Sequence, residues 1–354
     1  VESQTIVLNK MFSSQMWNEI IMLSKEIVDD ASSEIIDVVK KYYGLALFNL
    51  HKYDQALEIL RDLYQKSRKE NYFLYSVLAE IKSINFVWRE GCYECKERLV
   101  ELIKQLDSLK DNEQYVGNKN LVAMLYLETG YNLGISEKKY LEDAIERYQK
   151  FSDDIRNDES VKYLYALCLE LNGNIEDAGH IYAGMNWKNN ANIACRYLRC
   201  MLSRSKYAEA IKIYGKIDVS IINTKLKSLY LTALYYEDKV NYSGQLIEAL
   251  FEVKDNFEGI IDIAFGVHEK AYLNDNVVPF LKSHINTEVG ELGIQQKMEL
   301  LSILSHAGDL GLIIVVLRNV KDIATLNRYI VREIYDVVFD VSNKALINHD
   351  KTLI

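Results

Sequence analysis

The chain has 354 residues, which is enough for two or three globular domains or for a long array of repeats. Its net charge of −9, with both signs mixed throughout, argues against nonspecific nucleic-acid binding. The longest strongly apolar run, at 312–317, is far too short to cross a bilayer.

Helix-forming residues dominate the chain and strand-like alternation is rare, so the composition predicts an all-helical protein. Amphipathic stretches separated by polar turns divide it into successive helical hairpins. The expected hairpins, in chain order, occupy residues 1–28, 35–65, 72–106, 121–151, 161–185, 192–216, 225–253, 258–284 and 294–320. Pro279 is expected at a helix start, where its missing N–H does no harm.

We expect three segments along the chain. N-terminal hairpins occupy residues 1–110, central repeats occupy 119–255, and divergent hairpins with a capping helix occupy 256–354. The polar stretch at 107–118 is the expected internal break. The capping helix is expected over 324–343, because the last repeat of an array has no neighbour to cover its apolar face.

Small residues recur at a fixed distance across the turn of a hairpin. Gly44 precedes Ala56 by twelve positions (56 − 44 = 12), and Ala166 precedes Ala178 by the same distance. A small residue on each helix lets two backbones approach closely. The spacing therefore predicts closely packed antiparallel helix pairs.

Three other hairpins follow this spacing less closely. Ala210 keeps the second small residue, although Leu198 stands in place of the first. Ala144 is expected in the second position of hairpin 121–151, after a loop about two residues longer than the pattern requires. Gly244 is expected in that position in hairpin 225–253.

The pattern resembles the tetratricopeptide repeat, in which a small residue, a later alanine and then a large aromatic recur with a period near 34 residues. The step from Ala178 to Ala210 is 32 residues (210 − 178 = 32). The family's tryptophan and proline are absent, and the resemblance is clearest over 35–66 and 161–217. It implies an α-solenoid, a right-handed superhelix of antiparallel helical hairpins.

In that family the first helices of successive hairpins line a concave groove that binds a partner. Carried over position by position, the resemblance implies these partner-binding residues: Lys41, Tyr42, Asn49, Tyr163, Asn192, Arg196, Arg199 and Tyr230. Lys41 also matches the family's clamp for the tails of chaperones, but Leu45 stands where the clamp has asparagine. Chaperone-tail binding is therefore not expected.

Arg196 and Arg199 are three positions apart and share one face of a helix. With Tyr163 and Tyr230 on neighbouring first helices, they are expected to form a cationic pocket with aromatic walls. Guanidinium groups suit carboxylates and phosphates. The alternative is that both arginines pair with surface acids.

No motif for catalysis, nucleotide binding or metal binding stands out. Cys92 and Cys95 form a CxxC pair, but the nearest further cysteines, Cys195 and Cys200, lie about three repeats away, too far to complete a zinc site. The six histidines are scattered singly. We therefore expect no enzyme, no metal and no cofactor, and the five cysteines indicate free thiols in a reducing cytoplasm.

The function expected from these features is a non-catalytic scaffold or sensor that binds a protein or peptide segment in its concave groove, without nucleic acid or a membrane span. Because the first helix begins almost at Val1, we expect this scaffold to be one region of a larger multidomain protein. The alternative is a regulatory module that binds a small anionic ligand or a signal peptide.

Overall fold

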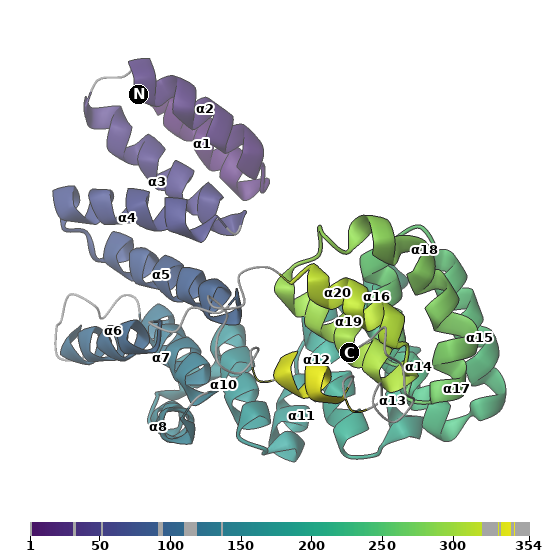
Figure 1. Ribbon diagram of the computed structural model, residues 1–354. Helices are drawn as coiled ribbons and strands as arrows, with labels where there is room; N and C mark the ends of the chain where they lie inside the picture. The colour runs from purple at the N-terminus through teal and green to yellow at the C-terminus, as the bar shows by residue number, and fades with distance from the viewer. Residues whose placement is uncertain are drawn as a thin grey trace. The chain divides into compact units, whose positions relative to one another are not determined.

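The computed structural model describes residues 2–30, 33–50, 52–90, 95–109, 119–135 and 137–320, together with 332, 334–340 and 343. Over these residues it contains α-helices, short 3-10 turns and one π-helical turn, and no strand (Figure 1). The predicted all-α solenoid of helical hairpins is confirmed. None of the described helices is long and apolar enough to span a membrane.

The chain forms two compact units, which are described separately. The first unit comprises most of the chain up to Cys168, and the second begins at Leu169, within one helix. The three segments expected from the sequence concern how well the repeat pattern is kept, and they remain a prediction.

The first unit is built from helix pairs that follow the expected hairpins. Its helices are α1 (Glu2–Ser13), α2 (Trp17–Asp30), α3 (Ser33–Asn49), α4 (Tyr53–Ser67), α5 (Glu70–Glu90), α6 (Cys95–Leu109), α7 (Lys119–Gly134), α8 (Lys138–Gln149), α9 (Asp153–Asn157) and the first part of α10 (Glu159–Leu171). Within this unit α1 packs on both α2 and α3, so the first helices of adjacent hairpins also touch.

The second unit continues the same alternation. Its helices are the end of α10, α11 (Ile175–Ala183), α12 (Ala191–Ser203), α13 (Tyr207–Tyr214), α14 (Thr224–Glu237), α15 (Lys239–Glu252), α16 (Phe257–Phe265), α17 (Lys270–Tyr272), α18 (Val278–Glu288), α19 (Ile294–Ala307) and α20 (Leu310–Arg318). The first helices α12, α14, α16 and α19 contact one another in that order, as stacked repeats require.

Side-chain caps fix where several helices of the second unit begin. The side chains of Asn190, Asn223 and Asn256 accept hydrogen bonds from backbone N–H groups in the first turns of α12, α14 and α16. Those groups have no partner within the helix itself, so a cap of this kind stabilises its start. The same chemistry recurs at Asp309, which caps α20.

The paired helices approach most closely where both carry a small residue. A Cβ atom added to Gly130 of α7 would lie 2.5 Å from the Cβ of Ala144 on α8. The two residues are fourteen positions apart (144 − 130 = 14), two more than in the clear repeats, which is the longer loop expected from the sequence. Ala166 and Ala178 are both fully buried.

The expected role of Gly244 is wrong. This glycine is exposed on α15, and a Cβ atom there would meet nothing within 4 Å. The buried face of α15 instead carries Tyr242 and Leu246, each two positions away. Two residues turn a helix by about 200°, so Gly244 points away from the core.

The C-terminal hairpins follow the expected turns. Gly308 ends α19 with a φ of 81°, a left-handed conformation that glycine adopts without strain. Pro279 lies in the first turn of α18, as predicted, directly after the π-helical turn Leu273–Val277. The expected helix at 324–343 lies largely outside the described residues. Within this range the described stretch 334–340 is helical.

His284 links two parts of the second unit. Its Nδ1 lies 2.6 Å from Glu288 Oε1 and its Nε2 lies 2.7 Å from the carbonyl oxygen of Lys254. Both contacts are hydrogen bonds only when both ring nitrogens carry protons, that is, in the imidazolium form. The bond to Glu288 is the main reason that the pKa of His284 is raised, outweighing partial burial.

We expect the imidazolium of His284 to make folding of the second unit pH-dependent. Because its pKa is raised in the folded state, its stabilising contribution is complete below the unfolded pKa of about 6.5 and is lost as pH rises through the folded pKa. The melting temperature of the wild type should therefore fall as pH rises from about 6.5 through the folded pKa of His284. The melting temperature of His284→Gln should lack this fall. His180→Gln, which changes an exposed histidine, should keep it.

Replacement of Gly130 and of Gly244 by alanine should have opposite effects on stability. Gly130→Ala should lower the free energy of unfolding by about 1–3 kcal/mol, because its methyl group overlaps Ala144. Gly244→Ala should raise it by up to about 1 kcal/mol, since alanine favours the helix and the space is empty. Urea unfolding measures both, and equal effects would contradict the packing described.

Candidate functional site

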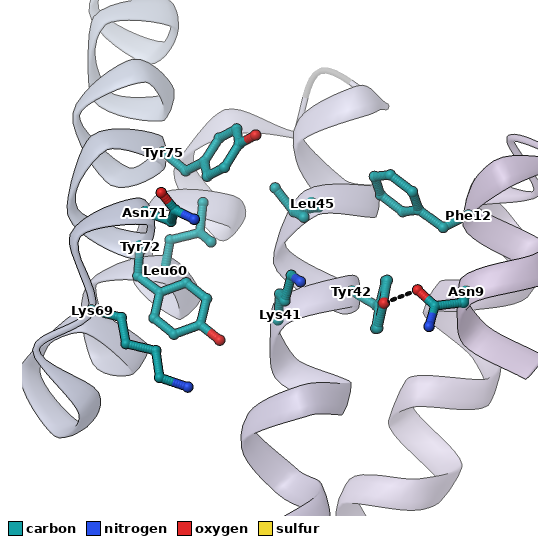
Figure 2. A pocket seen from close by; sticks show the side chains of 10 residues that line it. All are labelled: Asn9, Phe12, Lys41, Tyr42, Leu45, Leu60, Lys69, Asn71, Tyr72 and Tyr75. Carbon is teal, nitrogen blue, oxygen red and sulfur yellow. Dashed lines mark hydrogen bonds between the residues drawn. The ribbon is translucent and has the colours of Figure 1, made fainter. Parts of the chain in front are cut away.

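The first helices of the three N-terminal hairpins line a pocket of about 460 Å³ within the first unit (Figure 2). Its lining residues are Asn9 and Phe12 of α1, Lys41, Tyr42 and Leu45 of α3, Leu60 of α4, Lys69 just before α5, and Asn71, Tyr72 and Tyr75 of α5. Figure 2 shows α3 between α1 and α5, with side chains of all three helices directed into the space between them.

Helical periodicity explains why these side chains face the same space. Lys41 and Leu45 are four positions apart on α3, and Tyr72 and Tyr75 are three apart on α5. Residues at these separations lie on one face of a helix. Each of these first helices therefore presents one face to the pocket.

Tyr42 is held in place by α1. Its hydroxyl donates a hydrogen bond to Asn9 Oδ1, and its ring meets Phe12 edge to face at a centroid distance of 5.7 Å. Lys41 Nζ lies 5.2 Å from the centroid of the same ring, within the range of a cation–π contact. The position of Tyr42 is therefore fixed before any ligand binds.

The phenols of Tyr42 and Tyr72 remain protonated at neutral pH. Burial raises the pKa of Tyr42, and burial together with the charge of Asp37 raises the pKa of Tyr72. The Tyr72 hydroxyl is thus a hydrogen-bond donor as well as an acceptor.

The lysines in and around the pocket differ in whether they form ion pairs. Lys40 and Lys66 both pair with Asp62, at 2.8 Å and 3.0 Å. Lys41 and Lys69, which line the pocket, form no ion pair with any residue that the structure describes. The pocket therefore carries positive charge that the described residues around it do not neutralise.

Two of the partner-binding residues expected in the first unit, Lys41 and Tyr42, line this pocket. Asn49 does not line it. The Asn49 side chain is exposed near the end of α3 and donates a hydrogen bond to the carbonyl oxygen of Leu45, 2.8 Å away. Tyr163 also belongs to the first unit, on α10.

The repeat pattern did not indicate the residues that α1, α5 and the connection before α5 contribute, chiefly Asn9, Tyr72 and Lys69. The first and third hairpins keep the repeat pattern only weakly, so the family resemblance implies no binding residues in them. Asn9 and Tyr72 do lie on first helices next to the clear repeat that contains Lys41, and Lys69 lies directly before the second of these helices.

The remaining expected residues lie in the second unit. Arg196 Nη1 pairs with Glu170 Oε1 at 3.0 Å, so this arginine takes the alternative role of pairing with an acid. Arg199 is exposed and forms no ion pair within the described chain. Asn192 is exposed in the first turn of α12, where its backbone N–H is capped by Asn190.

Tyr230 of α14 is occupied by packing. Its ring stacks on that of Tyr214, with centroids 4.2 Å apart and planes 10° from parallel. The side chain stays partly buried against the core of the second unit. A binding role for Arg199, Asn192, Tyr163 and Tyr230 remains a prediction.

No group of three or more potential metal ligands occurs among the described residues. Cys92 of the CxxC pair lies outside those residues. Cys168, Cys195 and Cys200 are free thiols, and burial raises the pKa of each. A raised pKa makes a thiol a poor nucleophile at neutral pH.

A comparison with family models adds independent support for the repeat. Residues 137–217, from the start of α8 to just beyond α13, match the family described as anaphase-promoting complex, cyclosome, subunit 3, whose repeats are of the tetratricopeptide type. A search of curated proteins found no match to the chain. The match to the family model supports the tetratricopeptide-type helical repeat predicted from the sequence, and repeats of this type are typical of protein-interaction scaffolds.

The two arginines should differ in their effect on stability. Arg196→Gln removes the cation from Glu170, whose side chain is only 17% exposed, and should cost about 1–2 kcal/mol. Arg199→Gln should stay within about 0.5 kcal/mol of the wild type, because its side chain is exposed. Chemical unfolding of the two variants tests this, and a larger cost at Arg199 would contradict the pairing.

Proposed function

We propose that the chain is a non-catalytic scaffold whose first unit binds an extended segment of a partner protein in the pocket lined by α1, α3 and α5. The observation that carries this proposal is the position of the pocket on the first helices of three successive hairpins. That is the face on which the repeat resemblance implies partner binding.

The size and lining of the pocket suit side chains of a peptide. A volume of about 460 Å³ lies in the range of ordinary ligand pockets, and it admits one or two large side chains but not a folded domain. Tyr72 and Tyr75 supply rigid contact area, and they lose little conformational freedom on binding.

The pairing of charges favours the first unit over the arginines of the second. Glu170 already neutralises Arg196, whereas no described carboxylate pairs with Lys41 or Lys69. The alternative function, a small anionic ligand bound beside Arg196 and Tyr230, would first have to displace Glu170. The free thiols Cys168, Cys195 and Cys200 support a reducing compartment such as the cytoplasm.

Selection from a displayed random-peptide library against the whole chain tests the proposal. Asn71 lines the pocket and is exposed, so Asn71→Trp should fill the space without disturbing the core. We expect peptides selected on the wild type to bind this variant at least roughly tenfold more weakly by fluorescence anisotropy, which is about 1.4 kcal/mol.

The matched control is Gln65→Trp, which adds the same ring at an exposed position of α4 outside the pocket. It should bind the selected peptides like the wild type. Peptides that bind all three proteins equally would place the binding surface elsewhere and contradict the proposal. Circular dichroism of each variant checks that the helices are intact.

A further inference from the structure

The pocket of the first unit combines apolar surface with unbalanced positive charge. Phe12, Leu45 and Leu60 contribute apolar side chains, and the last two are almost fully buried. Lys41 and Lys69 contribute ammonium groups from opposite walls. A pocket with both apolar and cationic side chains suits a ligand that carries both an apolar group and a negative charge.

The two walls bring donors toward a common space. Figure 2 shows the Lys69 ammonium and the Tyr72 hydroxyl extending from the α5 side toward α3, the helix that carries Lys41. Tyr72 is a protonated phenol at neutral pH, because burial and the nearby charge of Asp37 raise its pKa. An anion in this space would therefore meet donors from both walls.

Other lysines close to the pocket do form ion pairs. Lys40 is bound to Asp62 across helices, and Lys66 reaches the same carboxylate. Lys41, beside Lys40 in the chain, is turned to the pocket instead and contacts the Tyr42 ring. Asp37 is a carboxylate close enough to influence Tyr72, but two ammonium groups outweigh it.

From these observations we infer that the pocket recognises an aromatic or large aliphatic side chain standing beside an anionic group, a carboxylate or a phosphate. This inference rests on the proposed function and adds the chemical class of the partner segment. The anion gains charge-assisted hydrogen bonds from Lys41, Lys69 and Tyr72, while the apolar group covers Phe12 and Leu45.

Three small probes separate charge from apolar contact: 3-phenylpropionate, phenyl phosphate and the neutral 3-phenylpropanol. Saturation-transfer NMR with the whole chain measures their dissociation constants at millimolar concentrations. We expect at least one anion to bind roughly five- to tenfold more tightly than the alcohol, because charge-assisted hydrogen bonds add to the same apolar contact.

Lys41→Gln/Lys69→Gln should abolish that preference while leaving binding of the alcohol unchanged. The control Lys66→Gln/Lys104→Gln removes the same charge from two exposed lysines of the first unit that lie outside the pocket. It should retain the preference, which also excludes a general effect of net charge.

The two anions distinguish the source of the negative charge. The second ionisation of a phosphate monoester has a pKa near 6, so phenyl phosphate should weaken as pH falls from about 7.5 to 5.5 if its dianion is recognised. A carboxylate keeps its charge over this range. The tighter anion at neutral pH identifies whether acidic or phosphorylated segments are preferred.

Equal binding of the alcohol and both anions would overturn the inference, as would a preference that survives the pocket variant or disappears in the control. Failure of both anions to bind would overturn it as well. None of these results would affect the peptide selection with Asn71→Trp. Peptides blocked by that variant but indifferent to Lys41 and Lys69 would leave the proposed function standing without anion recognition.

Discussion

The close approach of paired helices is the constraint on which the rest of this structure depends. Gly130 leaves no room for even a methyl group against Ala144 on the partner helix. Backbones held this near to one another fix how the two helices of a hairpin pack. The first helix of each hairpin can then stack on the next, and side chains such as Lys41 are left facing outward from that stack.

Ion pairs decide which of these outward residues remain available. Asp62 of α4 pairs with Lys40 of α3 and with Lys66 of its own helix, and Glu170 pairs with Arg196 of another helix. A long cationic side chain near a partly buried acid is drawn to it, because the acid is costly to leave unpaired. The charge open to a ligand is therefore what remains after this pairing, and in the first unit it includes Lys41 and Lys69.

The sequence predicted the fold well because the rule behind it is local. A small residue on each side of a turn predicts a tight hairpin. The separation of Gly130 and Ala144, two residues more than in the clear repeats, follows from the longer loop between them. Gly244 shows where the rule fails, since nothing in its neighbourhood distinguishes a glycine that packs from one that faces solvent. Only the rotation of α15, set by Tyr242 and Leu246, decides it.

The site was harder to predict because its parts meet through tertiary structure. Lys41 and Tyr42 could be identified because they lie in the clearest repeat. Tyr72 belongs to a hairpin that keeps the pattern weakly, and Lys69 lies in the connection before it. The sequence left open whether Arg196 binds a ligand or pairs with an acid, because the acid that it meets lies 26 positions earlier on another helix (196 − 170 = 26). Position in a repeat predicts which side chains face the groove, but the acids near the cationic ones determine which of these remain without an ion pair.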